Sequence, residues 1–198
     1  MQKKPQNIYQ FKITLEDIKP AVWRRIQVPE TYSFWDLHVA IQDSMGWLDY
    51  HLHQFTALNP KTGQKDVIGT PVDDGWGGAP TLPGWRTLIS SYFSSSNKKA
   101  DYEYDFGDSW KHKITLEKIL PPESGVKYPR CVAGERSCPP EDCGGAWGYE
   151  ELLEIMKDPR HEEYEERMEW VGDEFDPEKF DPSSVIFDDP KKRLKMMR

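Results

Sequence analysis

The stretch from Asp101 to Leu120, DYEYDFGDSWKHKITLEKIL, predicts a β-hairpin around which the rest of the fold is organised. Aromatic and acidic residues alternate before the tight turn, and apolar and polar residues alternate after it. A period of two in both arms is typical of half-buried strands. The sequence Phe106-Gly107-Asp108-Ser109 supplies the turn, where Gly107 is free to adopt a positive φ.

On either side of this hairpin, the hydrophobic pattern switches between the periods of strands and helices. Ser33 is a suitable N-cap for a central amphipathic helix, and Gly46 is a suitable residue to end it. In chain order, the predicted elements are strands at 8–18 and 22–28, a helix at 33–46, a strand at 51–58, a loop rich in Gly and Pro at 64–86, a short helix at 86–93, the central hairpin, an irregular region at 126–148, and helices at 149–156 and 161–171.

The order β-β-α-β-α-β-β, followed by helices, predicts an α+β fold. We expect a mixed, mostly antiparallel sheet with a β-grasp-like opening and a flank of C-terminal helices. Residues 1–189 are expected to form a single domain. Residues 190–198 form a basic C-terminal tail, which we expect to be frayed or docked.

Charge and hydropathy limit the compartment and the partners. Residues 141–189 contain 18 acidic residues against four basic ones, so this part of the chain repels nucleic acid. No apolar run is long enough for a transmembrane helix, and the N-terminus lacks the apolar segment of a signal peptide. We therefore expect a cytoplasmic protein with no membrane partner.

Carboxylates gather in two of the predicted loops. Asp105 and Asp108 bracket Gly107 in the hairpin turn, and Glu141-Asp142 follow two prolines in the irregular region. If these loops meet, the carboxylates and a histidine form a site for a divalent metal and hydrolytic chemistry. Alternatively, the aspartates only accept hydrogen bonds from their own backbone amides. The candidate catalytic residues are Asp105, Asp108, His112, Glu141 and Asp142, with His51 and His53 as further histidines.

The cysteines of the chain, Cys131, Cys138 and Cys143, all lie within the irregular region. Together with His112 or His161 they match the Cys3His donor set of a structural zinc site, a kind of site that holds irregular loops in place. The closely spaced cysteine pair that is common in zinc sites is missing, and free cysteines are often small core residues. Zinc is therefore a candidate cofactor, and structural thiols are the alternative.

Several long blocks carry a family likeness. They are the opening IYQFKITLEDIKPAVWRRIQVP, the helical FWDLHVAIQDSMGWLDYHLHQF, the hairpin YEYDFGDSWKHKI, the loop YPRCVAGERSCPPEDCGGAWGYEELL and the closing EWVGDEFDPEKFD. Over roughly residues 6–185, the chain resembles the plasmid pRiA4b Orf-3-like family. The resemblance implies a compact α+β fold and a link to mobile elements, because the family is similar to recombinase-like passenger proteins of insertion elements. It implies no catalytic residue.

Three functions remain open. The first is a non-enzymatic module that binds a protein partner or, in a mobile-element context, nucleic acid; the lack of a complete catalytic constellation favours it. The second is a metal-dependent hydrolase or nuclease-like enzyme, and the third is a zinc-stapled structural domain, which is compatible with either. Nucleic-acid binding requires a basic face, separate from the acidic helices, built from residues such as Arg24, Arg25, Lys98, Lys99, Lys111 and Lys113.

Overall fold

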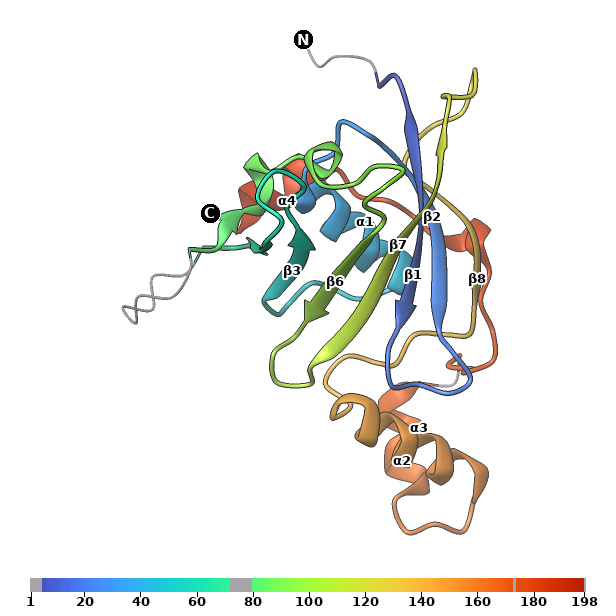
Figure 1. Cartoon of the computed structure of the whole chain (residues 1–198). Coiled ribbons are helices and arrows are strands. Elements are labelled where there is room, and N and C mark those ends of the chain that lie inside the picture. Colours follow the sequence, from blue (N-terminus) through green and yellow to red (C-terminus); the bar gives the residue numbers. More distant parts are fainter. Residues whose placement is uncertain (1–4, 72–79, 173, 198) are drawn as a thin grey trace.

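The computed structural model describes residues 5–71, 80–172 and 174–197. Within these residues the chain forms one eight-stranded sheet, with helices on one face and beyond one end of it (Figure 1). The predicted α+β class, with a mixed, mostly antiparallel sheet and C-terminal helices, is confirmed. The helices are α1 (Phe34–Met45), α2 (Gly145–Lys157), α3 (Tyr164–Val171) and α4 (Pro190–Met196), with short 3-10 turns at Gly84–Arg86, Ile89–Ser91 and Pro182–Ser184.

The strand order in the sheet is β5-β4-β3-β6-β7-β1-β2-β8. Neighbouring strands are antiparallel, except for the parallel pair β4 and β5. The hairpin β6–β7 therefore joins the half of the sheet built from β1 and β2 to the half built from β3 and β4. The strands are β1 (Ile8–Leu15), β2 (Trp23–Pro29), β3 (His53–Leu58), β4 (Lys65–Gly69), β5 (Leu82–Pro83), β6 (Lys99–Tyr104), β7 (Trp110–Leu120) and β8 (Arg130–Glu135).

The central hairpin forms as its alternation predicts, with Tyr102 opposite His112 and Tyr104 opposite Trp110. The turn differs from the prediction in its backbone. Its left-handed residues are Asp105, with φ 56°, and Ser109, with φ 55°, whereas Gly107 does not adopt a positive φ. Asp105 is held in this conformation because its Oδ1 accepts a hydrogen bond from the Gly107 amide at 2.9 Å.

Helix α1 begins and ends where the sequence predicts. Ser33 Oγ accepts a hydrogen bond from the Asp36 amide, and an Asp36 carboxylate oxygen accepts one from the Ser33 amide at 2.8 Å. Gly46 ends the helix with φ 90°, the left-handed conformation that glycine adopts most easily. The helix buries its apolar side against the sheet, with Phe34, Leu37 and Ile41 fully enclosed.

The opposite face of the sheet carries paired charges. Arg24 and Arg25 show the alternation between the two faces. Arg24 is only 1% exposed and lies on the core side, where its Nε donates to the Ser44 carbonyl at 2.8 Å. Arg25 lies on the other side and pairs with Glu117 at 2.6 Å.

Three strands were not predicted and one helix was predicted wrongly; one of these strands is β5 (Leu82–Pro83), which lies in the loop predicted at 64–86 and pairs with β4. Arg130–Glu135 lies within the predicted irregular region but forms the edge strand β8, because it pairs with β2. Lys65–Gly69 lies in the predicted loop and forms β4 against β3; residues 72–79 of that loop lie outside the described residues. The short helix predicted at 86–93 is replaced by 3-10 turns.

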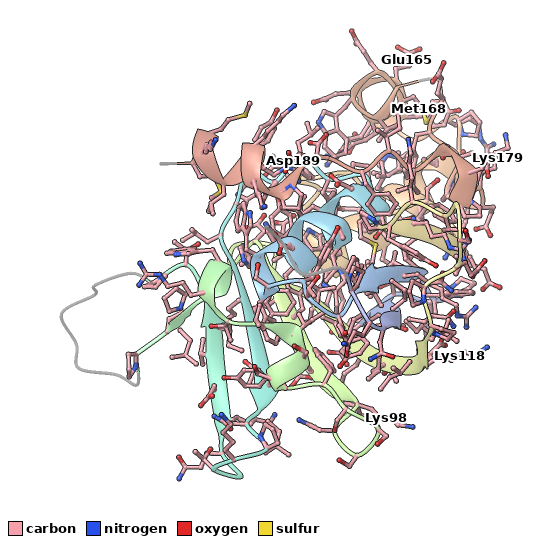
Figure 2. The ribbon with its side chains drawn as sticks, turned by 90° about the horizontal axis from the view of Figure 1, so that it is seen from above. Lys98, Lys118, Glu165, Met168, Lys179 and Asp189 are labelled. Atoms are coloured by element: carbon pink, nitrogen blue, oxygen red, sulfur yellow. The ribbon has the colours of Figure 1, made fainter. Side chains whose placement is uncertain are left out.

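The end of the chain docks on α1. Arg193 of α4 pairs with Asp43 of α1 at 2.7 Å, and the Trp35 indole donates to the Pro190 carbonyl at 2.8 Å. Figure 2 shows Asp189, the N-cap of α4, on the side of the molecule away from Lys98 and Lys118. Among the described residues, no helix has the length and apolar content needed to cross a membrane.

Candidate functional site

Three loops meet at the end of the sheet where β6 turns into β7 and the chain enters α2 (Figure 1). The Gly144 amide donates to Asp108 Oδ2 at 3.2 Å, which joins the β8–α2 loop to the hairpin turn. The Leu48 amide donates to Glu141 Oε2 at 2.8 Å, which joins it to the α1–β3 loop. The start of α2 lies close to the hairpin turn, because a Cβ on Gly145, which has φ +70°, would be 2.6 Å from the Asp108 carbonyl oxygen.

These loops bring together His51, Asp105 and Asp142, which we call the open group. One potential ligand atom from each residue lies within 4.8 Å of the other two. His51 Nε2 is 3.1 Å from Asp142 Oδ1 and 3.6 Å from Asp105 Oδ2. The Asp142 side chain is 67% exposed, that of His51 31% and that of Asp105 10%, so the group is open to solvent on one side.

His51 Nε2 makes no hydrogen bond to either carboxylate, although the atom is shielded from solvent. Both aspartates are also held in the left-handed region, Asp105 at φ 56° and Asp142 at φ 59°. This conformation is uncommon for residues other than glycine, and it clusters at functional sites. In Asp105, one carboxylate oxygen stabilises the turn and the other faces His51. Making a turn and binding a metal are therefore compatible roles for this residue.

Glu141 and Asp108 support the loops around the open group. Glu141 accepts hydrogen bonds from the Tyr104 hydroxyl and from the Leu48 amide, one at each oxygen. The Tyr104 hydroxyl also accepts a hydrogen bond from the Tyr50 amide at 3.1 Å, and burial next to Glu141 raises the pKa of Tyr104. Asp108 accepts from Gly144, as described above. Of the acidic candidates, Asp105 and Asp142 thus enter the group, and Glu141 and Asp108 position it.

His112 lies away from the open group. Its side chain is fully buried on the core side of β7, where Nδ1 bonds to the Trp110 carbonyl at 3.0 Å. Burial lowers the pKa of His112 to about 4, so the ring is neutral near pH 7. The structure therefore places it as a core residue whose ring packs against Trp47 and Tyr102.

The cysteines are free thiols in the described residues, and no group of potential metal ligands found there contains one. Cys138 is buried, whereas Cys131 and Cys143 are half-buried. Burial raises the pKa of all three and brings that of Cys143 to about 12. Their thiols are therefore protonated near pH 7 when no metal is bound.

A second group, His38, Asp49 and His53, is closed to solvent and is called the closed group. His38 Nε2 is 2.8 Å from Asp49 Oδ1, and His38 Nδ1 is 2.8 Å from the Tyr102 hydroxyl, so both ring nitrogens are hydrogen-bonded. The rings of His38 and His53 stack at 3.4 Å with an angle of 9° between their planes. Metals bind imidazole lone pairs, which lie in the ring plane, so the stacked rings hold the lone pairs of His38 and His53 in two nearly parallel planes. We therefore describe the closed group as a core cluster in which His38 is hydrogen-bonded and His53 Nε2 has no hydrogen-bond partner among the described residues.

The closed group also depends on α4. Arg193 lies 3.7 Å from Asp49, the carboxylate that His38 contacts. Burial raises the pKa of Asp49 to about 6 and lowers those of His38 and His53. Neither His38 nor Asp49 is among the sequence-predicted site residues. The signal that the sequence offers is a histidine on the apolar face of the predicted helix 33–46.

Three of the six basic residues considered for nucleic-acid binding, Arg24, Arg25 and Lys113, are buried or paired with acidic side chains. Arg24 is buried, and its guanidinium lies 3.6 Å from the Phe180 ring centre. Lys113 pairs with Asp101 at 2.6 Å, and Arg25 pairs with Glu117. Acidic and basic side chains therefore alternate on the open face of the sheet.

The chain is similar to proteins whose function is unknown. A crystal structure of a protein of unknown function from Methanosarcina mazei Go1 has a TM-score of 0.88 and 53% sequence identity, covering 93% of this chain and 100% of that chain. The uncharacterized protein y4hQ of Sinorhizobium fredii is 38% identical over 167 residues, which are 84% of this chain and 81% of that protein. The family model described as plasmid pRiA4b ORF-3-like protein matches residues 7–184. Because that match spans most of the chain, and the fold and the relatives agree with it, the chain belongs to the plasmid pRiA4b ORF-3-like family.

Proposed function

We propose that the chain binds a divalent metal ion through His51, Asp105 and Asp142 and uses it to activate water for hydrolysis. The observation that carries the proposal is the position of His51 Nε2. This atom is shielded from solvent and lies 3.1 Å and 3.6 Å from two carboxylate oxygens, yet it forms no hydrogen bond with them. A cation between the three side chains gives each of these atoms a partner.

The distances support a shared metal. Zinc and similar ions bind imidazole nitrogen and carboxylate oxygen at about 2.0–2.2 Å. Two such ligands are about 3.0 Å apart when the angle at the metal is 90°, and about 3.4 Å apart when it is tetrahedral. The two separations at His51 Nε2, 3.1 Å and 3.6 Å, are close to this range.

The donor set and the exposure favour a catalytic over a structural ion. One imidazole and two carboxylates suit zinc, manganese or iron more than calcium, which prefers oxygen ligands alone. Three protein ligands leave coordination positions for water and substrate, as in hydrolytic metal sites. A bound metal lowers the pKa of its water and so provides a nucleophile near neutral pH. Asp142, the most exposed ligand, lies where substrate can approach.

On the sequence alone, a non-enzymatic binding module is favoured over a metal-dependent hydrolase, because no complete catalytic constellation is visible along the chain. The open group is assembled from three loops that are far apart in sequence, so its absence from the linear pattern carries little weight. The Cys3His zinc site stays a separate hypothesis, and the same experiment tests it.

The test is metal binding by purified, untagged protein that has been stripped with chelator. Calorimetric titration with Zn²⁺ and with Mn²⁺ is expected to show one site per chain for at least one of these ions. The variants His51→Gln and Asp142→Asn are expected to weaken it by roughly tenfold or more, because each removes a direct ligand. Glu162→Gln, at an exposed carboxylate outside both groups and outside the Cys3His set, is the matched control.

Unchanged binding in both variants would overturn the proposal. Metal binding that is lost instead in Cys138→Ser, together with thiols that become reactive on chelation, would support the zinc-stapled domain. Colorimetric thiol titration of the loaded and stripped protein distinguishes the two sites.

A further inference from the structure

Large exposed apolar side chains lie on the segments that build the open group, and they indicate the class of ligand that it takes. In the described part of the chain, Tyr50 is 74% exposed, Phe106 50% and Trp147 86%. Contiguous apolar side chains on the surface mark places where a ligand or partner binds. The apolar rim comprises Leu48, Tyr50, Leu52, Phe106 and Trp147.

The backbone contacts place this rim at the open group. The Asp105 amide donates to the Leu52 carbonyl at 2.9 Å, and Phe106 follows Asp105 directly. Leu48 and Tyr50 belong to the loop that carries His51, and their amides bond to Glu141 and to Tyr104.

Trp147 belongs to the helix that follows the third loop. It lies in the first turn of α2, which begins next to the Gly144 amide that bonds to Asp108. Two of the three loops that build the open group therefore contribute exposed apolar residues, and α2, which continues the third loop, contributes Trp147.

The charge around the site is negative. The segments 48–52, 104–109 and 141–148 contain no lysine or arginine. A divalent ion balances the charges of Asp105 and Asp142, and the carboxylates of Asp108 and Glu141 remain. A phosphate group that approaches the metal meets these two negative charges and no basic side chain on these segments, and nucleic-acid binding depends on basic contacts. An uncharged or basic ligand meets no such repulsion, and cations are attracted to exposed aromatic faces.

We propose that the apolar rim binds an extended peptide with apolar and basic side chains, and that the open group hydrolyses its backbone amide. This inference rests on the proposed function for the chemical step but not for binding. Hydrolysis adds one water molecule across the C–N bond: the oxygen bonds to the carbonyl carbon, and the C–N bond breaks. The acyl product leaves as a carboxylate and both protons end on the nitrogen, which leaves as an ammonium group, so no other reactant is needed.

The binding test uses three fluorescein-labelled probes with the metal-loaded protein. They are a peptide of alternating Leu, Phe and Lys, the same peptide with Glu in place of every Lys, and single-stranded DNA of similar length. Fluorescence anisotropy is expected to show that the basic peptide binds. The acidic peptide and the DNA are expected to bind more weakly than the basic peptide by roughly tenfold or more, because the carboxylates at the site repel negative charge.

The variants Tyr50→Ala and Trp147→Ala are expected to weaken binding of the basic peptide by roughly tenfold, because exposed aromatic anchors dominate such surfaces. Trp170→Ala, at a 46% exposed tryptophan of α3, is the matched control and is expected to change nothing. Metal content is measured in these three variants and is expected to equal that of the parent. Cleavage is followed by mass spectrometry of the basic peptide, with His51→Gln as the inactive control.

The outcomes separate this inference from the proposed function. Metal binding without any peptide binding, or DNA binding tighter than peptide binding, would overturn the inference and leave the metal site in place. Peptide binding that depends on Tyr50 and Trp147 in a protein that binds no metal would support the rim as a binding surface and reject the hydrolytic function.

Discussion

His51 Nε2 lies 3.1 Å from Asp142 Oδ1, and this contact connects the α1–β3 loop to the β8–α2 loop. Neither loop belongs to the central hairpin, yet both reach the same carboxylate of its turn, that of Asp105. The open group therefore depends on how the loops are held in place as well as on its ligands. Residues that fix the loops without contacting the metal become the most informative positions to change.

Tyr104→Phe is expected to weaken metal binding by roughly tenfold, as second-shell substitutions commonly do. The substitution removes the hydroxyl that donates to Glu141 and accepts from the Tyr50 amide, so both loops lose a contact. Isothermal titration with the preferred metal measures the effect. Tyr149→Phe is the matched control, because the buried Tyr149 hydroxyl has no hydrogen-bond partner within the described part of the chain. Equal affinity in the two variants would show that Glu141 does not position the site.

Gly148→Ala is expected to destabilise the protein by about 1–3 kcal/mol, the usual cost of overpacking. An added Cβ would lie 1.9 Å from the Cys143 carbonyl oxygen, so the loop that carries Asp142 has to move. Alanine normally stabilises a helix interior relative to glycine, so the expected sign is the reverse of the usual one. Urea unfolding measures the loss of stability, and metal titration of the same sample measures the effect of the displaced loop on metal affinity. Glu151→Ala, at an exposed position of α2, controls for changes in the helix itself; a stabilised Gly148→Ala variant with full metal affinity would refute the prediction.

Local periodicity was sufficient to predict the hairpins and α1. The arms of β6 and β7 alternate as far as Leu116. Ser33 and Asp36 form the capping box at the start of the apolar pattern of α1. Strand β8 was missed because Arg130–Glu135 contains small residues of intermediate burial and becomes a strand through pairing with β2. The residues of β8 therefore show no strand pattern of their own, and only the pairing with β2 makes the segment a strand.

The candidate site was predictable only in part, for the same reason. Asp105 and Asp142 were identified by residue type in loops, and they enter the open group. His112 was chosen because it is close to them in sequence, but strand alternation places it on the core side of β7 with Trp110 and Ile114. The imidazole of the open group comes from His51, one of the two further histidines. The hydrogen bond from the Asp105 amide to the Leu52 carbonyl holds the start of β3 beside the end of β6, and this places His51 next to the Asp105 carboxylate.

His112→Phe is expected to make stability less dependent on pH. Burial lowers the pKa of His112 from 6.5 to about 4 in the folded protein. The unfolded chain therefore binds a proton that the folded chain does not, and the resulting stability is present above pH 6.5 and is lost as the pH falls to about 4. The free energy of unfolding of the parent, relative to the variant, should fall by about 3 kcal/mol between pH 7 and pH 4. Urea titrations across this range measure it, with His161→Gln as the exposed control; parallel curves for parent and His112→Phe would contradict the assignment.

Arg193→Ala is expected to destabilise the fold by about 3 kcal/mol at pH 8, because it leaves buried carboxylates without their cation. Arg193 lies 2.7 Å from Asp43 and 3.7 Å from Asp49, and both aspartate side chains are at most 5% exposed. Burial raises the pKa of Asp49 to about 6, so this carboxylate is protonated below that pH and needs a cation less. The loss should therefore be smaller at pH 5 than at pH 8, as measured by urea unfolding at both values. Lys192→Ala, at an exposed position of the same helix, should stay within about 0.5 kcal/mol of the parent. A loss of equal size at both pH values would show that α4 stabilises the protein through packing on α1 rather than through the charge that Arg193 places beside Asp49.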